Sequence, residues 1–357
     1  MQLSDMRFSA LYQRGVMLEQ MKEPALSRTI KQMEHTPEPI EGRKPVSSLE
    51  EITPEEIIET ARLAGIIDET DGEHLADKLC RFAGKAPAVL VDAIDDEPYV
   101  SSQMGPMLAC REECARGVRL IEKAVGSSDS TILVYKNLSD IELSIPHAVD
   151  GIPVRRIGGK YPTQIRLMEE LELDDDDNEK TIFVGACALI HLCRAVYEGI
   201  RQTTAYVTVA GNCIGFPRNV EAPIGTPVLD LIKLCGLAEN PTRIILGGPI
   251  TGISITNLEE ASVDVNTTAV LVIRDDHRDF LYECIGCGRC ANACPQGLNP
   301  MQILRELRRK NYKGAEQLGL WECSHCMCCS YICPSRQSVA GEILLYQENH
   351  PKGGEEP

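Results

Sequence analysis

The chain has 357 residues, a length that suits about two or three domains. Its 53 acidic and 36 basic side chains give a formal net charge of −17, which argues against nucleic acid as a partner because phosphates select basic surfaces. Its 16 cysteines indicate a reducing compartment, since free thiols are oxidised outside one.

Residues 1–48 mix charge, proline and short apolar stretches, and we interpret them as an arm or linker with one helix over 11–21. The segment is either a partner-docking arm or a poorly ordered terminus. Neither this segment nor any later one approaches about 18 uninterrupted apolar residues. We therefore expect no signal peptide and no membrane span. The prediction is a cytoplasmic protein that meets a membrane complex only through a partner.

Residues 49–202 are predicted to form a domain of alternating strands and helices. The stretch from Thr53 to Glu56 is a capping box with proline at the first helical position, and it predicts a helix that ends at Gly65. Further helices are predicted over 106–125 and 186–198, and strands over 86–94, 131–135, 142–145, 154–157 and 181–185. Strands that alternate with helices indicate an α/β domain with a largely parallel sheet.

Residues 203–276 have a different pattern, with short strands, glycine-rich turns and one central helix within "VLDLIKLCG". This pattern is typical of a small sheet packed on a helix. The chain as a whole is therefore predicted to be a multidomain protein of α/β and α+β class.

The last part, residues 277–357, contains two cysteine runs, Cys284 to Pro295 and Cys323 to Pro334, and each reads C-x2-C-x2-C-x3-C-P. This spacing is that of bacterial ferredoxins with two [4Fe–4S] clusters, in which three close thiolates hold one cluster and the cysteine before proline reaches the other. The predicted ligands of the first cluster are Cys284, Cys287, Cys290 and Cys333. The predicted ligands of the second cluster are Cys323, Cys326, Cys329 and Cys294.

Two structural zinc sites or a disulfide framework are the alternatives, because C-x2-C pairs also occur in zinc ribbons. Zinc takes four ligands in two pairs, whereas each run here offers a triplet and a Cys-Pro, which favours the clusters. A helix capped by Asn299, with Pro300 at its first position, is predicted to bridge the two runs.

Other cysteines and a group of basic residues have two interpretations each. Cys328 lies between two predicted ligands and is either a buried neighbour, which we favour, or a substitute ligand. Cys110 and Cys114 share a predicted helix face and are either core residues, which we favour, or a third metal or redox pair. Four basic residues near the end of the bridging helix form either a solvated face, which we favour, or a surface that steers an acidic electron carrier. These are Arg305, Arg308, Arg309 and Lys310.

The order of these parts resembles a known family. The helix ending in Gly65, the strand leading into "DDEPY", the "VTVAGN…GGPITG" unit and the two cysteine runs together resemble the C subunit of the Rnf complex, a ferredoxin:NAD oxidoreductase. The resemblance covers roughly residues 50 to 340 and is strongest from Tyr206 onward. It implies that the middle unit is an SLBB β-grasp domain and that the preceding domain is similar to the flavin- and NADH-binding subunit of complex I. Relatives with the same body reduce corrinoid cofactors or deliver electrons to other reductases.

The chain departs from the family at the flavin loop. The family has G-x-G-G-x-G-F-P there, because glycine backbone must approach the flavin phosphate closely, whereas this chain has Ile66 to Gly72 with three carboxylates. An asparagine that opens the last helix in the family is Gly185 here, and a second glycine-rich element is replaced by 163–166. Glu97 and Tyr99 match the family and are the candidate residues of a vestigial flavin site. We therefore expect that the chain has lost FMN and NADH binding.

The prediction is an iron–sulfur electron-transfer subunit. It would relay single electrons through two [4Fe–4S] clusters, between a ferredoxin or flavoprotein and a partner oxidoreductase. No side chain suggests an acid, base or nucleophile, so we expect no catalysis by this chain itself. One alternative is a flavin-dependent NADH dehydrogenase or corrinoid reductase that binds its cofactor around 95–99. Another is an adaptor whose clusters are structural.

Overall fold

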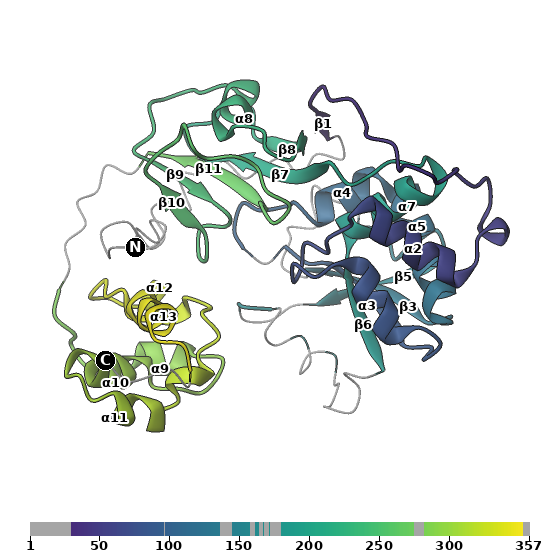
Figure 1. The fold of residues 1–357 in the computed structure, drawn as a ribbon. Coiled ribbons are helices and arrows are strands. Elements are labelled where there is room, and N and C mark those ends of the chain that lie inside the picture. The colour runs from purple at the N-terminus through teal and green to yellow at the C-terminus, as the bar shows by residue number, and fades with distance from the viewer. Residues whose placement is uncertain are drawn as a thin grey trace.

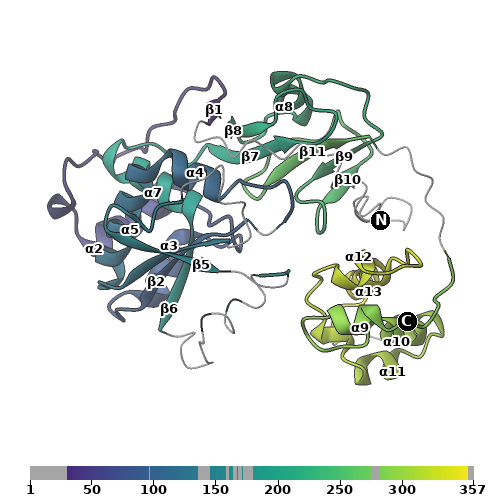
Figure 2. The same ribbon diagram turned by 180° about the vertical axis from the view of Figure 1, so that it is seen from behind.

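The computed structural model describes residues 30–95, 97–135, 145–157, 161–163, 167, 171, 180–274 and 282–352. These residues form two separate β-sheets, each packed with helices, and a C-terminal module made of short helices (Figure 1, Figure 2). The predicted multidomain α/β and α+β class is confirmed. Within the described ranges, no helix combines the length and the apolar composition needed to cross a bilayer.

The first sheet has five strands in the order β4-β5-β3-β2-β6, and all its pairs are parallel except β4 with β5. Its strands are β2 (Ala88–Ala93), β3 (Ser130–Tyr135), β4 (Ala148–Val149), β5 (Ile152–Ile157) and β6 (Thr181–Gly185). Val89, Val91 and Ala93 of β2 face one core with the helices, while Leu90 packs on the opposite face. The parallel α/β arrangement agrees with the prediction.

Helices on one face of this sheet share a single core with β2, β3 and β6. They are α2 (Pro54–Ala64), α3 (Leu75–Phe82), α4 (Met104–Ala109), α5 (Arg111–Val125) and α7 (Ala186–Tyr197), and a short 3-10 turn, η1 (Leu49–Glu51), precedes α2. The capping box is confirmed, because the Thr53 hydroxyl accepts from the Glu56 amide and the Glu56 carboxylate accepts from the Thr53 amide. Gly65 ends α2 with a positive φ of 67°.

The single helix predicted over 106–125 is wrong in detail, because the structure has α4 and α5 there. Cys110 has φ −109° and ψ 47°, which lies outside the helical region and interrupts the helix between them. The Asp95 carboxylate accepts from the amides of Gln103 and Met104, so α4 also begins earlier than predicted. The helix predicted over 11–21 and most of the strand predicted over 142–145 lie outside the described residues.

The second sheet has the order β1-β8-β7-β11-β9-β10 and packs against one helix, α8 (Val228–Cys235). Its strands are β1 (Lys31–Gln32), β7 (Thr204–Ala210), β8 (Arg218–Pro223), β9 (Arg243–Leu246), β10 (Ile253–Ile255) and β11 (Ala269–Ile273). The short strand β1 comes from the N-terminal arm and pairs in parallel with β8. Ile40 then donates its amide to Gly199, so the described part of the arm contacts both sheet domains.

The C-terminal module has its own apolar core. Its helices are α9 (Arg289–Ala293), α10 (Pro300–Arg308), α11 (Tyr312–Gln317), α12 (Cys328–Tyr331) and α13 (Val339–Asn349), with a 3-10 turn, η4 (Leu320–Glu322), before the second cysteine run. The predicted cap of α10 is confirmed, because the Asn299 side chain accepts from the Gln302 amide and Pro300 follows it. In both views α12 lies on the side of the module that faces the rest of the protein, and α11 lies on the far side (Figure 1, Figure 2).

Candidate iron–sulfur centres and the adjoining cavities

The predicted ligands of the second cluster line one cavity in the module. Cys294 comes from the end of α9 in the first run, whereas Cys323, Cys326 and Cys329 come from the second run. Apolar side chains complete the lining, and they include Leu298, Ile303, Met327 and Ile343. The structure thus places one cysteine of the first run and three of the second along the same cavity, and their assignment as the ligands of one cluster stays a prediction.

Backbone geometry and hydrogen bonds prepare this cavity for a metal cluster. His325 and Met327 have positive φ values of 55° and 60°, which wind the chain tightly between the cysteines. Hydrogen bonds from the Cys328 thiol and from backbone amides lower the pKa of Cys326 to about 6, so its thiolate is favoured at neutral pH. The four cysteines line this cavity together, although no group of three or more Cys, His, Asp or Glu side chains among the described residues is arranged closely enough to hold a metal ion. Thiols in apolar surroundings are the ligand type that iron–sulfur clusters take.

The predicted ligands of the first cluster lie nearer the surface. Cys287 is exposed, whereas Cys284, Cys290 and Cys333 are half-buried. Gly286 and Gly288 have φ values of 68° and 71°, in the left-handed region that glycine adopts at low cost. Cys284 and Cys290 pack against the module core, and the charge of Cys333 contributes to the raised pKa of Cys290, after the larger effect of burial. The grouping of Cys333 with the first run stays a prediction from the cysteine spacing.

Three further cysteines, Cys328, Cys110 and Cys114, lie outside the two predicted ligand sets. The Cys328 sulfur lies 3.7 Å from the carbonyl oxygen of Tyr161, which brings the second cysteine run into contact with the first domain. Cys114 lies in the core of the first domain, and Cys110 packs against that core. Burial is the main cause that raises the pKa of both thiols to about 12, so both stay protonated at neutral pH.

A cavity of about 520 Å³ lies where the family resemblance implies a flavin. Its walls come from the first domain, from the "GGPITG" turn of the second domain and from residues 324–326 of the module. Cys326 lines both this cavity and the cavity of the second ligand set. The second set therefore borders the cavity between the domains.

The loop that replaces the family's flavin loop is held by Lys78. The Lys78 ammonium lies 2.6 Å from the Asp68 carboxylate, 2.7 Å from that of Asp71 and 3.1 Å from the carbonyl oxygen of Phe183. Asp68 is fully buried, and it also accepts from the amide of Gly185 at 3.1 Å. The carboxylates of this loop are thus bound within the protein, a partnership that the sequence analysis missed.

Glu69 occupies the N-terminus of α7. Its two carboxylate oxygens accept from the amides of Cys187 and Ala188 at 2.9 and 3.0 Å, where a helix would otherwise receive a phosphate. A Cβ atom at Gly185 would lie 2.2 Å from the Glu69 carboxyl group, so a glycine at this position leaves room for Glu69. Burial, with the charge of Asp68 second, raises the pKa of Glu69 to about 8.

Glu97 lines the same cavity, but it binds the second domain. Its carboxylate accepts from the amides of Ile250 and Thr251 at 2.6 and 2.9 Å, and from the Thr251 hydroxyl. A Cβ atom at Gly248 would lie 2.2 Å from this carboxylate, which explains the glycine there. Tyr99 has a φ of 67° and packs against the core of the second sheet. Both candidate flavin residues therefore hold two domains together in this structure.

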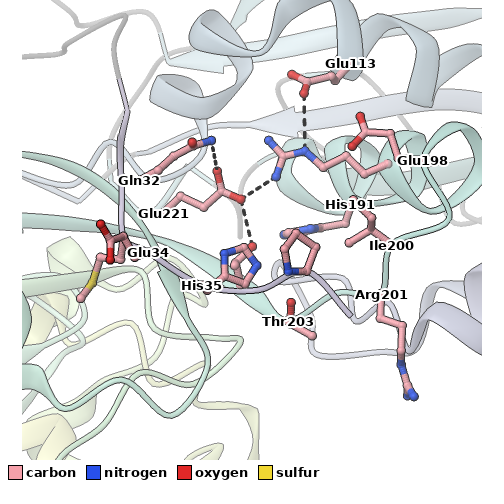
Figure 3. A pocket seen from close by; sticks show the side chains of 14 residues that line it. Gln32, Glu34, His35, Glu113, His191, Glu198, Ile200, Arg201, Thr203 and Glu221 are labelled. Carbon is pink, nitrogen blue, oxygen red and sulfur yellow. Dashed lines mark hydrogen bonds and ion pairs between the residues drawn. The ribbon is translucent and has the colours of Figure 1, made fainter. Parts of the chain in front are cut away.

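A second cavity, of about 580 Å³, lies between the arm, α7 and the second sheet. Figure 3 shows Glu221 next to Gln32 of the arm, and the Gln32 amide donates to its carboxylate at 3.2 Å. Glu221 also pairs with the guanidinium of Arg194, which lies 3.4 Å from the Glu113 carboxylate. His191 is only 4% exposed, and its Nε2 atom has no hydrogen-bond partner among the described residues. Burial lowers the pKa of His191 to about 4, so its imidazole is neutral at pH 7.

This histidine predicts a loss of stability in mild acid. An unfolded chain binds a proton on His191 below pH 6.5, whereas the folded chain does not until about pH 4, so protonation favours unfolding as the pH falls between these values. Between about pH 7.5 and 5.5, we expect the free energy of unfolding of the wild type, measured with urea, to fall by about 1.4 kcal/mol more than that of His191→Phe. His74→Gln, at an exposed position, is the control and keeps the wild-type dependence. Equal pH dependence of the wild type and His191→Phe would contradict the prediction.

Two family models match the chain. A model described as SLBB domain matches residues 206–254, and a model described as 4Fe-4S dicluster domain matches residues 283–336, which contain all eight predicted ligands. The predicted middle unit and cluster module are thereby confirmed as these two kinds of domain.

Curated relatives match most of the chain. The C subunit of the ion-translocating oxidoreductase complex of Vibrio cholerae is 28% identical over 295 residues, which cover 78% of this chain and 38% of that protein. Its counterpart in Rhodobacter capsulatus is 27% identical, over 76% of this chain and 55% of its own length. The C subunit of the proton-translocating ferredoxin:NAD(+) oxidoreductase complex of Clostridium ljungdahlii is 28% identical, over 61% of this chain and 50% of that protein. The resemblance to these proteins is confirmed, although the chain spans only about two fifths to just over half of their length.

Solved structures support the fold. A chain of an NAD+-reducing [NiFe]-hydrogenase in the air-oxidized state aligns with a TM-score of 0.55 at 16% identity, over 84% of this chain and 62% of that chain. A chain of an NAD+-reducing [NiFe]-hydrogenase in the H2-reduced state gives a TM-score of 0.53 at 15% identity, over 97% of this chain and 67% of that chain. At this identity the likeness concerns the architecture alone.

Proposed function

We propose that this chain is an iron–sulfur electron-transfer subunit, which relays single electrons between a ferredoxin or flavoprotein and a partner oxidoreductase. The observation that carries the proposal is the cavity in which Cys294 of the first run meets Cys323, Cys326 and Cys329 of the second. Crossed ligation of this kind is specific to proteins with two neighbouring [4Fe–4S] clusters. The match to a 4Fe-4S dicluster domain supports it.

Eight thiolates would hold the two clusters. One set is Cys284, Cys287, Cys290 and Cys333, and the other is Cys294, Cys323, Cys326 and Cys329. When bound, such clusters supply one-electron oxidation and reduction. The side chains of this module position the thiolates, donate hydrogen bonds to sulfur and exclude water from the second set, and each of these effects tunes a reduction potential.

We further propose that the chain binds neither FMN nor NADH. The Glu69 carboxyl group fills the helix terminus that would receive a phosphate, and Glu97 binds the "GGPITG" turn. A flavin phosphate would have to displace Glu69 from two amide hydrogen bonds next to Asp68. The cavity beside Cys326 is therefore closed to phosphate at this end, and the first two domains act as a scaffold.

We propose protein partners, because two predicted clusters offer a route for electrons that other proteins must supply and receive. The named relatives belong to ion-translocating complexes. We propose by analogy that this chain works within an oxidoreductase complex, in the cytoplasm and peripheral to a membrane only through its partners. The donor and the acceptor would then be other proteins of that complex or mobile electron carriers.

Anaerobic purification with chemical analysis tests the proposal. We expect about eight iron and eight sulfide per chain, no flavin, and no change of the cluster absorbance when NADH is added, followed by reduction with dithionite. Stoichiometric FMN together with bleaching by NADH would overturn the assignment and make this chain an NADH-oxidising enzyme. Clusters that dithionite cannot reduce would instead indicate a structural role.

A further inference from the structure

The cavity beside the N-terminal arm contains buried polar groups that lack a partner. Residues of the arm, α7 and the second sheet line it, and its volume is about 580 Å³. Two of its lining residues, His191 and Thr203, have a buried side-chain atom, Nε2 and the hydroxyl oxygen, without a hydrogen bond to any part of the chain that the structure describes. Buried polar groups normally have partners, so these two atoms indicate an occupant that forms hydrogen bonds.

The charges at this cavity are mainly negative. Figure 3 shows three carboxylates around the single guanidinium of Arg194, and they belong to Glu113, Glu198 and Glu221. Arg194 pairs with Glu221 and lies 3.4 Å from the Glu113 carboxylate, whereas Glu198 makes no ion pair with a described residue. The side chain of Arg201 points away from this group in Figure 3. Three carboxylates beside one guanidinium leave two negative charges uncompensated, which favours a cationic occupant.

The C-terminal end of α7 adds to this preference. The helix ends at Tyr197, and Glu198 and Ile200, which follow it, line the cavity. The last carbonyl groups of a helix carry partial negative charge and attract cations. His191 does not oppose a cation, because burial lowers its pKa to about 4 and the imidazole is neutral at pH 7. A neutral imidazole also has one nitrogen that can accept a hydrogen bond from an ammonium group.

We propose that this cavity binds a small linear organic cation with two or more ammonium groups, the chemical class of the polyamines. Ammonium groups only donate hydrogen bonds, so they suit the carboxylates of Glu113 and Glu198 and the hydroxyl oxygen of Thr203. The volume of about 580 Å³ lies in the range of sites for small molecules. A metal ion fits less well, because the described residues hold no group of three or more suitable ligands. This site is independent of the electron-transfer function proposed above.

Isothermal titration of the full chain with 1,4-diaminobutane, at about pH 7.5 and about 20 mM salt, tests the site. We expect saturable binding that Glu198→Gln weakens about tenfold, because it removes an unpaired carboxylate, and that Thr203→Val weakens about fivefold, because it removes only a hydroxyl group. Glu259→Gln makes the matched change at an exposed position outside the cavity lining and is expected to keep the wild-type affinity. Succinate, a dianion of similar length, is expected not to bind.

Three results would overturn the inference. Absence of binding up to about 10 mM diamine would leave the cavity to ordered water. Wild-type affinity in Glu198→Gln, or an equal loss in Glu259→Gln, would indicate unspecific attraction to the net charge of −17. Binding of succinate in place of the diamine would reverse the charge assignment. Urea unfolding checks that each variant is folded, and Glu198→Gln decides if Thr203→Val is not, because Glu198 is exposed.

Discussion

Replacing Cys333 by serine is expected to remove the same iron–sulfur cluster as replacing Cys287, although the two residues belong to different runs. In the same way, Cys294→Ser is expected to remove the cluster that Cys326→Ser removes, because Cys294 shares a cavity with the second run. Each variant would lose about four of the eight iron atoms, since a [4Fe–4S] cluster rarely survives the loss of a thiolate. Iron analysis and electron paramagnetic resonance of the reduced protein measure which cluster remains.

Two other cysteines provide the controls for this experiment. Cys80→Ser changes an exposed thiol of the first domain and is expected to retain eight iron atoms. Cys328→Ser changes the residue whose thiol contacts Tyr161 and is expected to retain them too, with an altered reduction potential, because the hydrogen bond to Cys326 changes. If Cys333→Ser removed the cluster of the second run instead, the crossed assignment would be wrong. Loss of iron in Cys328→Ser would identify it as a ligand.

The sequence predicts the parts of this protein whose causes are local. The cap of α2 at Thr53, the cap of α10 at Asn299 and the strand predicted over 86–94 each depend on a few neighbouring residues, and the structure has all three. The cysteine spacing is also local within each run. The meeting of Cys294 with the second run is long-range, and it was predictable because the metal cluster dictates which thiols must converge.

The sequence could not predict the arrangements that depend on distant partners. The carboxylates of Asp68 and Glu69 indicated only negative charge, whereas their hydrogen-bond partners lie at Lys78, Gly185 and the first turn of α7. The sequence shows which side chains carry a charge, but it does not show which groups lie next to them in the folded protein. The same limit applies to Glu97, which matched a flavin-binding position of the family while its partners belong to the second domain.

The hydrogen-bond partners of Asp68 and Glu69 suggest an electrostatic explanation for the loop at 66–72, which differs from the glycine-rich flavin loop that the resemblance implies. A loop rich in glycine binds a phosphate with its amides, and the phosphate supplies the negative charge. Here the Asp68 carboxylate supplies negative charge from within the chain and Lys78 balances it, while the Glu69 carboxyl group occupies the amides at the start of α7. Asp68, Glu69, Lys78 and Gly185 thus form one connected set of residues.

Replacing Lys78 by methionine is expected to destabilise the first domain by about 3–5 kcal/mol, because it leaves the fully buried Asp68 carboxylate without its counter-ion. Loss of the ammonium also removes its hydrogen bonds to Asp71 and to the carbonyl oxygen of Phe183. The midpoint of urea unfolding, followed by circular dichroism, measures the change. Lys233→Met removes an exposed lysine that pairs with Asp230 at 3.0 Å, and it is expected to cost less than about 1 kcal/mol.

A second substitution separates the orphaned charge from the lost packing. In the double variant Lys78→Met with Asp68→Asn the buried charge is gone, so we expect it to recover part of the stability that Lys78→Met loses. A Lys78→Met protein within about 1 kcal/mol of the wild type would show that Asp68 finds its stabilisation elsewhere, from the Gly185 amide and the Thr70 hydroxyl. The amides at the start of α7, and not Lys78, would then be the main groups that stabilise the negative charge of Asp68.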